Sequence, residues 1–125
     1  MPPTPAKKPG VNKFLSLLFA SRTQAHVFHL QTSSFAAHKA LEDYYTGIVG
    51  LADLYAETYK GASGRKIVFT SSPITNDPRK ALAYFMRIRS SISRMNIPKN
   101  GPLKNILDGI IELIDTTIYK LKFLK

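Results

Sequence analysis

The stretch from His38 to Glu57, HKALEDYYTGIVGLADLYAE, decides the fold that we expect for this chain. It contains no proline, and its apolar residues recur at helical spacing, which predicts one long helix. Four potential metal ligands occur in it at successive spacings of 4, 11 and 4 residues: His38, Glu42, Asp53 and Glu57. Because three turns of an α-helix take about eleven residues, all four lie on one side, within about a third of the circumference.

This side of the helix is expected to border the hydrophobic core, because apolar residues interleave with the ligands: Leu41, Tyr45, Val49, Ala52 and Ala56. A carboxylate beside a core is costly unless it is ion-paired, hydrogen-bonded or bound to a cation. Two interpretations stay open on spacing alone. The four residues form part of a metal site, or they are a charged helix edge that pairs with Lys or Arg of a neighbouring element.

The composition is that of one globular domain, with 125 residues of which 44% are hydrophobic. The absence of cysteine excludes disulfides, zinc–thiolate sites and thiol catalysis. No apolar run reaches the length of about eighteen residues that a membrane-spanning helix needs, and the N-terminus lacks the pattern of a signal peptide. We therefore expect a cytoplasmic protein with no membrane partner.

The charge is unevenly distributed along the chain, whose net charge is +10. Residues 38–57 hold one lysine against four acids, which gives −3 and leaves +13 for the other 105 residues. A negative spot within a strongly positive chain suits a cation site in a protein that meets a polyanion. Nucleic acid is the polyanion that we expect, although solubility alone also accounts for surplus charge.

Residues 1–11, MPPTPAKKPGV, are predicted to form a basic, proline-rich tail, and residues 12–125 a four-helix bundle domain. Lys7 and Lys8, together with Lys13 just beyond the tail, are expected to lie along the phosphates of nucleic acid. The alternative is a tail without a binding role.

Four helices are expected. The first runs from a cap at Asn12 to about Gln31 and carries Arg22, His26 and His29 on its inner face, and Thr32 or Ser33 caps the second, which runs to about Lys60. After a long connection over residues 61–76, with a short extended piece at 67–69, the third starts at Pro78 and ends at Pro98, and the fourth starts at Pro102. This order predicts an all-α, antiparallel four-helix bundle with a long crossover between helices 2 and 3, the ferritin-like connectivity.

Two further patterns concern the surface. Lys80, Arg87 and Arg94 recur every seven residues on the third helix, which predicts a basic ridge for phosphate or, alternatively, an ordinary solvated face. Gly47 and Gly50 lie inside the second helix, where glycine costs about 1 kcal/mol relative to alanine, so we expect another helix to approach closely there, either within the chain or across an interface.

The ligand pattern resembles the ferroxidase signature of the Dps-type mini-ferritins, the starvation-induced DNA-protection proteins. In that family a histidine, an acid four residues later, an aspartate eleven residues after that and a glutamate in an Ala-Glu pair supply iron ligands. His38, Glu42, Asp53 and Glu57 match these positions, and Ala56 precedes Glu57.

The family also has a histidine on the preceding helix, twelve residues before the first histidine of the signature. His26 has that spacing, and His29 is its rival. The resemblance covers residues 26–61 and is closest in character to the small Dps-like proteins encoded by bacteriophages.

The resemblance implies a ferroxidase that stores iron inside a hollow dodecamer built from dimers. Its di-iron sites would lie between subunits, with a first-helix histidine, His38 and Glu42 from one subunit and Asp53 and Glu57 from its mate. Peroxide would oxidise the bound Fe(II), and the basic tail would bind DNA without sequence preference. The alternative is a catalytically inactive ferritin-like structural or interaction protein, such as a component of a phage virion that contacts other virion proteins.

Overall fold

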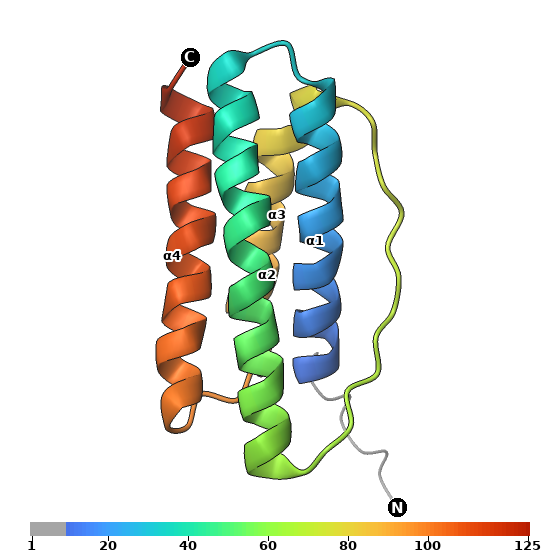
Figure 1. The fold of residues 1–125 in the computed structure, drawn as a ribbon, viewed down its shortest axis with the longest axis vertical. Helices are drawn as coiled ribbons and strands as arrows, with labels where there is room; N and C mark the ends of the chain where they lie inside the picture. Colours follow the sequence, from blue (N-terminus) through green and yellow to red (C-terminus); the bar gives the residue numbers. More distant parts are fainter. Residues whose placement is uncertain (1–9) are drawn as a thin grey trace, which may run out of the picture.

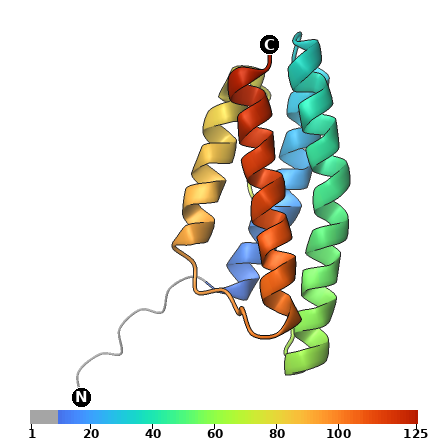
Figure 2. The ribbon, with the colours of Figure 1, turned by 90° about the vertical axis from the view of Figure 1, so that its left-hand side faces the viewer.

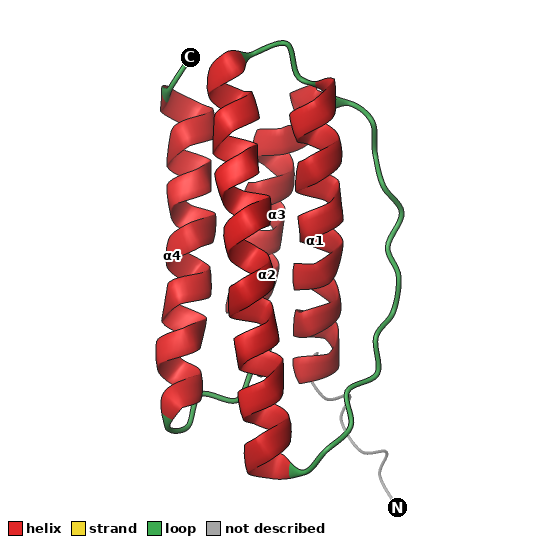
Figure 3. Ribbon diagram, viewed as in Figure 1, coloured by secondary structure: helices red, strands yellow, loops and turns green. Residues whose placement is uncertain are grey.

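Four α-helices and one short 3-10 helix make up the computed structural model of the chain, which describes residues 10–125. In order they are α1 (Val11–Gln31), α2 (Phe35–Ser63), η1 (Pro78–Lys80), α3 (Ala81–Ser93) and α4 (Pro102–Phe123), as Figure 1 shows. No strand occurs in this part of the chain (Figure 3). The prediction of an all-α four-helix bundle is therefore confirmed.

Neighbouring helices of the bundle run in opposite directions. α2 packs against α1 and α4, and α3 packs against α4 and, less extensively, α1 (Figures 1 and 2). Since α2 and α3 run in the same direction, the chain has to return along the whole bundle between them. Residues 64–77 make this return on the outside of α1, so the long connection lies where the sequence predicted it.

The core consists of apolar side chains from all four helices. Its largest fully buried members are Phe14, Leu15, Leu18, Phe28, Leu41, Tyr44, Ile48, Tyr55, Phe85, Ile110 and Ile114. One buried polar pair is satisfied internally. The Ser21 hydroxyl donates to the Leu18 carbonyl at 2.7 Å, so the Tyr44 hydroxyl donates to Ser21 Oγ at 2.6 Å. Burial raises the pKa of Tyr44, which keeps this hydroxyl protonated as a donor.

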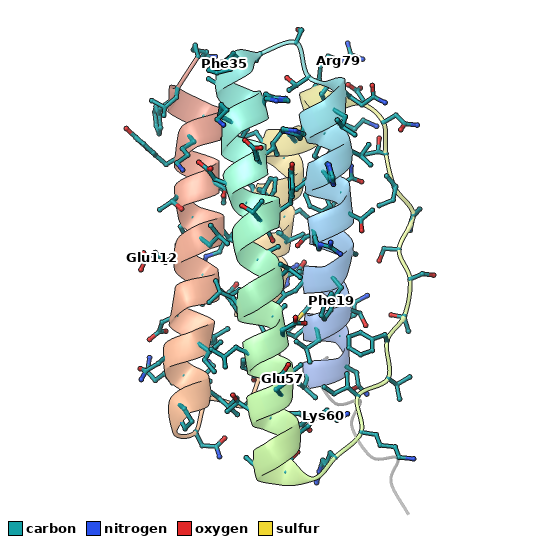
Figure 4. The ribbon with its side chains drawn as sticks, viewed as in Figure 1. Phe19, Phe35, Glu57, Lys60, Arg79 and Glu112 are labelled. Atoms are coloured by element: carbon teal, nitrogen blue, oxygen red, sulfur yellow. The ribbon has the colours of Figure 1, made fainter. Side chains whose placement is uncertain are left out.

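The crossover is pinned to α1 by side chains of that helix. Asn12 Oδ1 accepts from the Val68 N–H at 3.2 Å, and Ser16 Oγ accepts from the Thr70 N–H at 3.0 Å. The Gln24 amide both donates to and accepts from the Thr75 backbone, at 2.9 Å in each case. Phe19 and Phe69 add an edge-to-face contact with ring centroids 5.4 Å apart, and Figure 4 shows Phe19 on the crossover side of α1. A long segment without regular structure is thereby held in one place.

The helix boundaries differ from the predicted ones in several places, and α2, for example, ends at Ser63 and not near Lys60. α1 begins at Val11, and Asn12 holds the crossover instead of capping the helix. Ser34, and not Thr32 or Ser33, caps α2, because its Oγ is the one that accepts from the Ala37 N–H. α3 ends at Ser93, five residues before Pro98.

The structure also bears on two other expectations from the sequence. Residues 67–69 are extended without pairing into a strand. Arg22 and His26 are exposed instead of lying on the inner face of α1.

Gly47 and Gly50 lie in the middle of α2, and one of them marks a close approach of helices. A Cβ at Gly47 would lie 3.1 Å from Leu113 of α4, whereas a Cβ at Gly50 would meet nothing within 4 Å. The prediction of close approach is therefore confirmed within the chain for Gly47. At Gly50 the described residues 10–125 leave the space open, and approach across an interface stays a prediction. Among residues 10–125, no helix is both long and apolar enough to cross a membrane.

Candidate functional site

The three histidines of the chain gather at the end of the bundle where α1 turns into α2. His29 and His38 stack face to face, with ring centroids 3.6 Å apart and planes 20° apart. Two reciprocal hydrogen bonds join the two residues. His29 Nδ1–H donates to the His38 carbonyl at 2.8 Å, and His38 Nδ1–H donates to the His29 carbonyl at 2.9 Å. This reciprocal pair fastens the last turn of α1 to the first turn of α2.

The two hydrogen bonds also fix which ring nitrogens are free. A carbonyl oxygen only accepts, so the proton of each ring resides on Nδ1. In the neutral rings, Nε2 of His29 and Nε2 of His38 then carry lone pairs. A backbone carbonyl bound to Nδ1–H is the usual support of a histidine that ligates a metal through Nε2.

His26 occupies the outer side of this cluster, one turn before His29. Its ring is stacked on Tyr45 at 4.2 Å and lies 5.8 Å from the ring of His29. His26 is exposed and His29 is buried. From the sequence, Tyr45 was expected only to be an apolar neighbour of the candidate ligands. Its position two turns after His38 was the available signal that it shares the face of the imidazoles.

Glu42 lies one turn beyond His38 and is already paired within its own helix. Its Oε2 accepts from Lys39 Nζ at 2.7 Å. This hydrogen bond and the lysine charge hold the pKa of the Glu42 carboxyl below its usual value, and the nearby imidazoles of His29 and His38 add smaller contributions in the same direction. A cation bound at Glu42 would therefore compete with Lys39.

Asp53 and Glu57 lie on the same helix but far from the imidazoles. At 1.5 Å per residue, Asp53 is about 16 Å along the axis from Glu42, and Glu57 is about 28 Å from His38. Figure 4 shows this separation, with Phe35 at one end of α2 and Glu57 near the other. Both carboxylates are exposed, so the expected cost of placing them beside the core does not arise.

The described part of the chain offers Asp53 and Glu57 no ion pair. The neighbouring cation that the second interpretation required is thus missing for these two acids within residues 10–125. Equally, these residues bring together no group of three or more His, Asp or Glu side chains that could hold a metal ion. One chain therefore presents two separate donor sets, and each is incomplete as a metal site.

The basic candidates divide into three sets. Lys7 and Lys8 lie outside the described residues. Lys80, Arg87 and Arg94 are exposed along one side of η1 and α3, and none of them has an acidic partner among residues 10–125. Lys13 is exposed in the first turn of α1, where it lines a cavity together with Arg87. From the sequence, Lys13 was expected to act together with the tail. In the fold it lines a cavity together with residues of α3.

Comparison with known proteins gives a family and a viral relative. Residues 29–121 match a family described as "Family of unknown function (DUF5856)". The chain is also 37% identical over 115 residues to the "Uncharacterized 14.6 kDa protein in mobD-ri intergenic region" of Enterobacteria phage T4. That alignment covers 92% of this chain and 90% of the phage protein. No solved structure matches.

Proposed function

Since the chain belongs to the DUF5856 family, whose function is unknown, its activity has to be argued from its own residues, and we propose that it is a Dps-like, ferritin-like iron-binding protein. Two copies together would form the iron site. His38 and Glu42 of one copy would meet Asp53 and Glu57 of the other, with His26 or His29 as a further ligand. The bound Fe(II) is the substrate, and peroxide oxidises it.

The numbering of the four ligands is the observation that carries this proposal. When two copies of a helix pack antiparallel about a two-fold axis, residues face each other in pairs whose numbers have a constant sum. Glu42 with Asp53 and His38 with Glu57 both sum to 95. One axis near residues 47 and 48 would therefore complete two identical sites at once. Each would combine imidazole nitrogen with carboxylate oxygen, a donor set that suits iron.

The surface near this axis supports close packing of two helices. Thr46 and Gly50 are small and exposed on the side of α2 that carries the ligands. A Cβ at Gly50 would meet nothing within 4 Å among residues 10–125, so this part of the chain leaves the space beside it open to a second helix. The Thr46 hydroxyl donates to the Glu42 carbonyl of its own helix at 2.8 Å and leaves no polar group to be buried unpaired.

Non-specific DNA binding is the second part of the proposal. Lys7 and Lys8 of the tail, and the exposed Lys13, Lys80, Arg87 and Arg94, would neutralise phosphates without reading bases. The net charge of +10 supports this role.

Iron oxidation in mixed variants tests the proposed site most directly. Fe(II) is added without oxygen, peroxide follows, and the formation of ferric iron is recorded. We expect His38→Ala/Glu42→Ala and Asp53→Asn/Glu57→Gln each to fall to the rate of free iron. After unfolding and refolding together in equal amounts, they should recover about a quarter of the wild-type rate, because half of the dimers are mixed and each has one intact site. Glu112→Gln, at an exposed acid of α4, should keep full activity.

Oxidation at wild-type rate in both double variants would contradict the iron site. Activity lost in both and not recovered in the mixture would contradict its assembly from two copies.

The alternative of a structural component of a phage particle also has an observation behind it. The relative is a phage protein, and exposed apolar side chains cluster at the turn between α1 and α2 and at the end of α4: Leu30, Phe35, Phe123 and Leu124. Such a patch is typical of a contact surface with another protein. The mass in solution separates the two functions, since a closed shell of about twelve chains supports the Dps-like assembly and a metal-free monomer supports the structural one.

A further inference from the structure

A groove runs between α3, the crossover and α1, on a different side of the bundle from the iron ligands. It consists of two adjoining cavities of about 270 and 340 Å³. They share five lining residues: Gln24, Pro73, Ile74, Tyr84 and Arg87. From Lys80 to Ser91 the groove follows α3 for about 16 Å at 1.5 Å per residue.

The lining of this groove is basic. Lys13 reaches it from α1, Lys80 from η1 and Arg87 from α3, and neither cavity is lined by an acidic residue. The nearest acid along the chain, Asp77, is held by Arg79 through a hydrogen bond of 3.0 Å. Three cations spaced along one groove whose lining holds no acidic residue attract an anion with several charges.

Arg87 is held in position by an aromatic neighbour. Its guanidinium lies 5.3 Å from the centre of the Tyr84 ring. Tyr84 is itself fixed by edge-to-face contacts with Phe28 and Phe85. An arginine that is ordered before binding loses less side-chain entropy when it contacts a phosphate or a planar base.

The walls of the groove match a ligand that is part apolar and part anionic. Ile74, Ile88 and Met95 provide apolar surface, and Ser72 and Ser91 provide hydroxyls. Cavities of this size admit separate bases and phosphates, whereas the bases of a duplex are stacked inside it and cannot reach the walls.

We propose that this groove binds a short stretch of single-stranded nucleic acid. Lys13, Lys80 and Arg87 would contact the phosphates, and the apolar walls would contact the bases. The inference rests on the nucleic-acid part of the proposed function and assigns it a site and a form of the ligand. It does not depend on iron.

Binding of a fluorescent twelve-nucleotide oligothymidylate to the full chain, followed by anisotropy over a range of salt concentrations, tests the groove. We expect Lys13→Gln/Lys80→Gln/Arg87→Gln to weaken binding about 100-fold at 0.1 M salt. The slope of log K against log salt should become shallower by about 2, at about 0.7 per phosphate contact on a single strand.

The matched control is Arg22→Gln/Lys60→Gln/Lys99→Gln, which removes the same number of arginines and lysines from exposed positions that line neither cavity. It should retain most of the affinity. Tyr84→Leu keeps the charge and removes the ring under Arg87, so affinity should fall about two- to fivefold with an unchanged salt slope. A purely structural role of Tyr84 would instead appear as lost helicity.

The following results would count against the groove or against nucleic-acid binding as a whole. Equal weakening by the two triple variants would overturn the groove and leave non-specific DNA binding intact. Tighter binding of a twelve-base-pair duplex than of the single strand, or competition by free thymidine monophosphate at the same concentration of nucleotide, would also overturn it. Absence of binding to every nucleic acid, with iron oxidation preserved, would remove the nucleic-acid part alone.

Discussion

Both ends of α2 carry side chains that could bind a metal ion, but these side chains have different surroundings within the chain. At the end near α1, His38 is stacked on His29 and bonded to its carbonyl, and Glu42 is paired with Lys39. At the other end, Asp53 and Glu57 are exposed and have no ion pair within residues 10–125. The first end therefore has a structural role in a single chain, whereas no ion pair among residues 10–125 gives the two carboxylates such a role.

This difference separates stability from function. Residues that hold the fold have to be kept whether or not iron binds, so they say little about activity. An exposed acid without an ion pair among residues 10–125 contributes less to holding the fold, so its substitution reports more directly on a partner outside that chain. The two carboxylates are therefore the sharper test of the second copy in our proposal.

The largest expected effect is a loss of stability at the histidine end of α2. His29→Ala removes a buried ring and its hydrogen bond to the His38 carbonyl, so it should lower the free energy of unfolding by about 2 to 3 kcal/mol. Asp53→Asn/Glu57→Gln should change it by less than about 0.5 kcal/mol, as surface substitutions do. Urea unfolding followed by circular dichroism measures both. Equal losses at the two ends would show that the carboxylates do stabilise the single chain.

A smaller loss of stability is expected for Tyr55, which anchors the carboxylate end of α2 to the loop before α4. The buried Tyr55 hydroxyl donates to the Pro98 carbonyl at 2.6 Å, so Tyr55→Phe should cost about 1 kcal/mol at neutral pH. Burial raises the pKa of Tyr55 to about 12, against about 10 in an unfolded chain.

The folded state therefore holds this proton more tightly, and its contribution is complete below pH 10 and lost as the pH rises through 12. We expect the gap between wild type and Tyr55→Phe to narrow over this window in unfolding experiments. A gap that is constant from pH 8 to 12 would contradict the raised pKa.

The smallest expected effect distinguishes Gly47 from Gly50, the two glycines in the middle of α2. Gly50→Ala should stabilise each chain by about 0.5 to 1 kcal/mol, because alanine favours helix and the added methyl group meets nothing. The same methyl group would lie near the proposed two-fold axis, so dimerisation should weaken. Gly47→Ala should gain nothing, since its Cβ would press on Leu113 at 3.1 Å. Analytical ultracentrifugation and unfolding of both variants check this, and unchanged dimerisation of Gly50→Ala would place the axis elsewhere.

Most of the secondary structure followed from the sequence because helix periodicity and proline are local signals. The long helix around His38 to Glu57, the break before it and the long crossover were all predicted in the right places. The predictions failed where a distant contact took over a side chain, or where neighbouring hydroxyls offered the same cap. Asn12 was free to cap α1 but accepts from Val68 instead, and the choice of Ser34 as cap depends on one hydroxyl in a run of three.

The candidate sites were only partly predictable. The position of the four ligands on one side of α2 was read directly from their spacing. That Asp53 and Glu57 are exposed depends on which neighbours cover α2, and the spacing cannot show this. The basic groove was not predicted, because Lys13 and Arg87 are 74 residues apart in sequence and line one cavity only once the helices have packed.

The sequence by itself thus determined which donors share a helix face, because the rise and turn of a helix fix relative positions within a single element. Only the tertiary structure decided that His29 stacks on His38, that the acids at the far end of α2 are left exposed, and that Lys13 lies opposite Arg87. These relations join different helices, and they are set by how apolar faces pack and by where the crossover returns along α1.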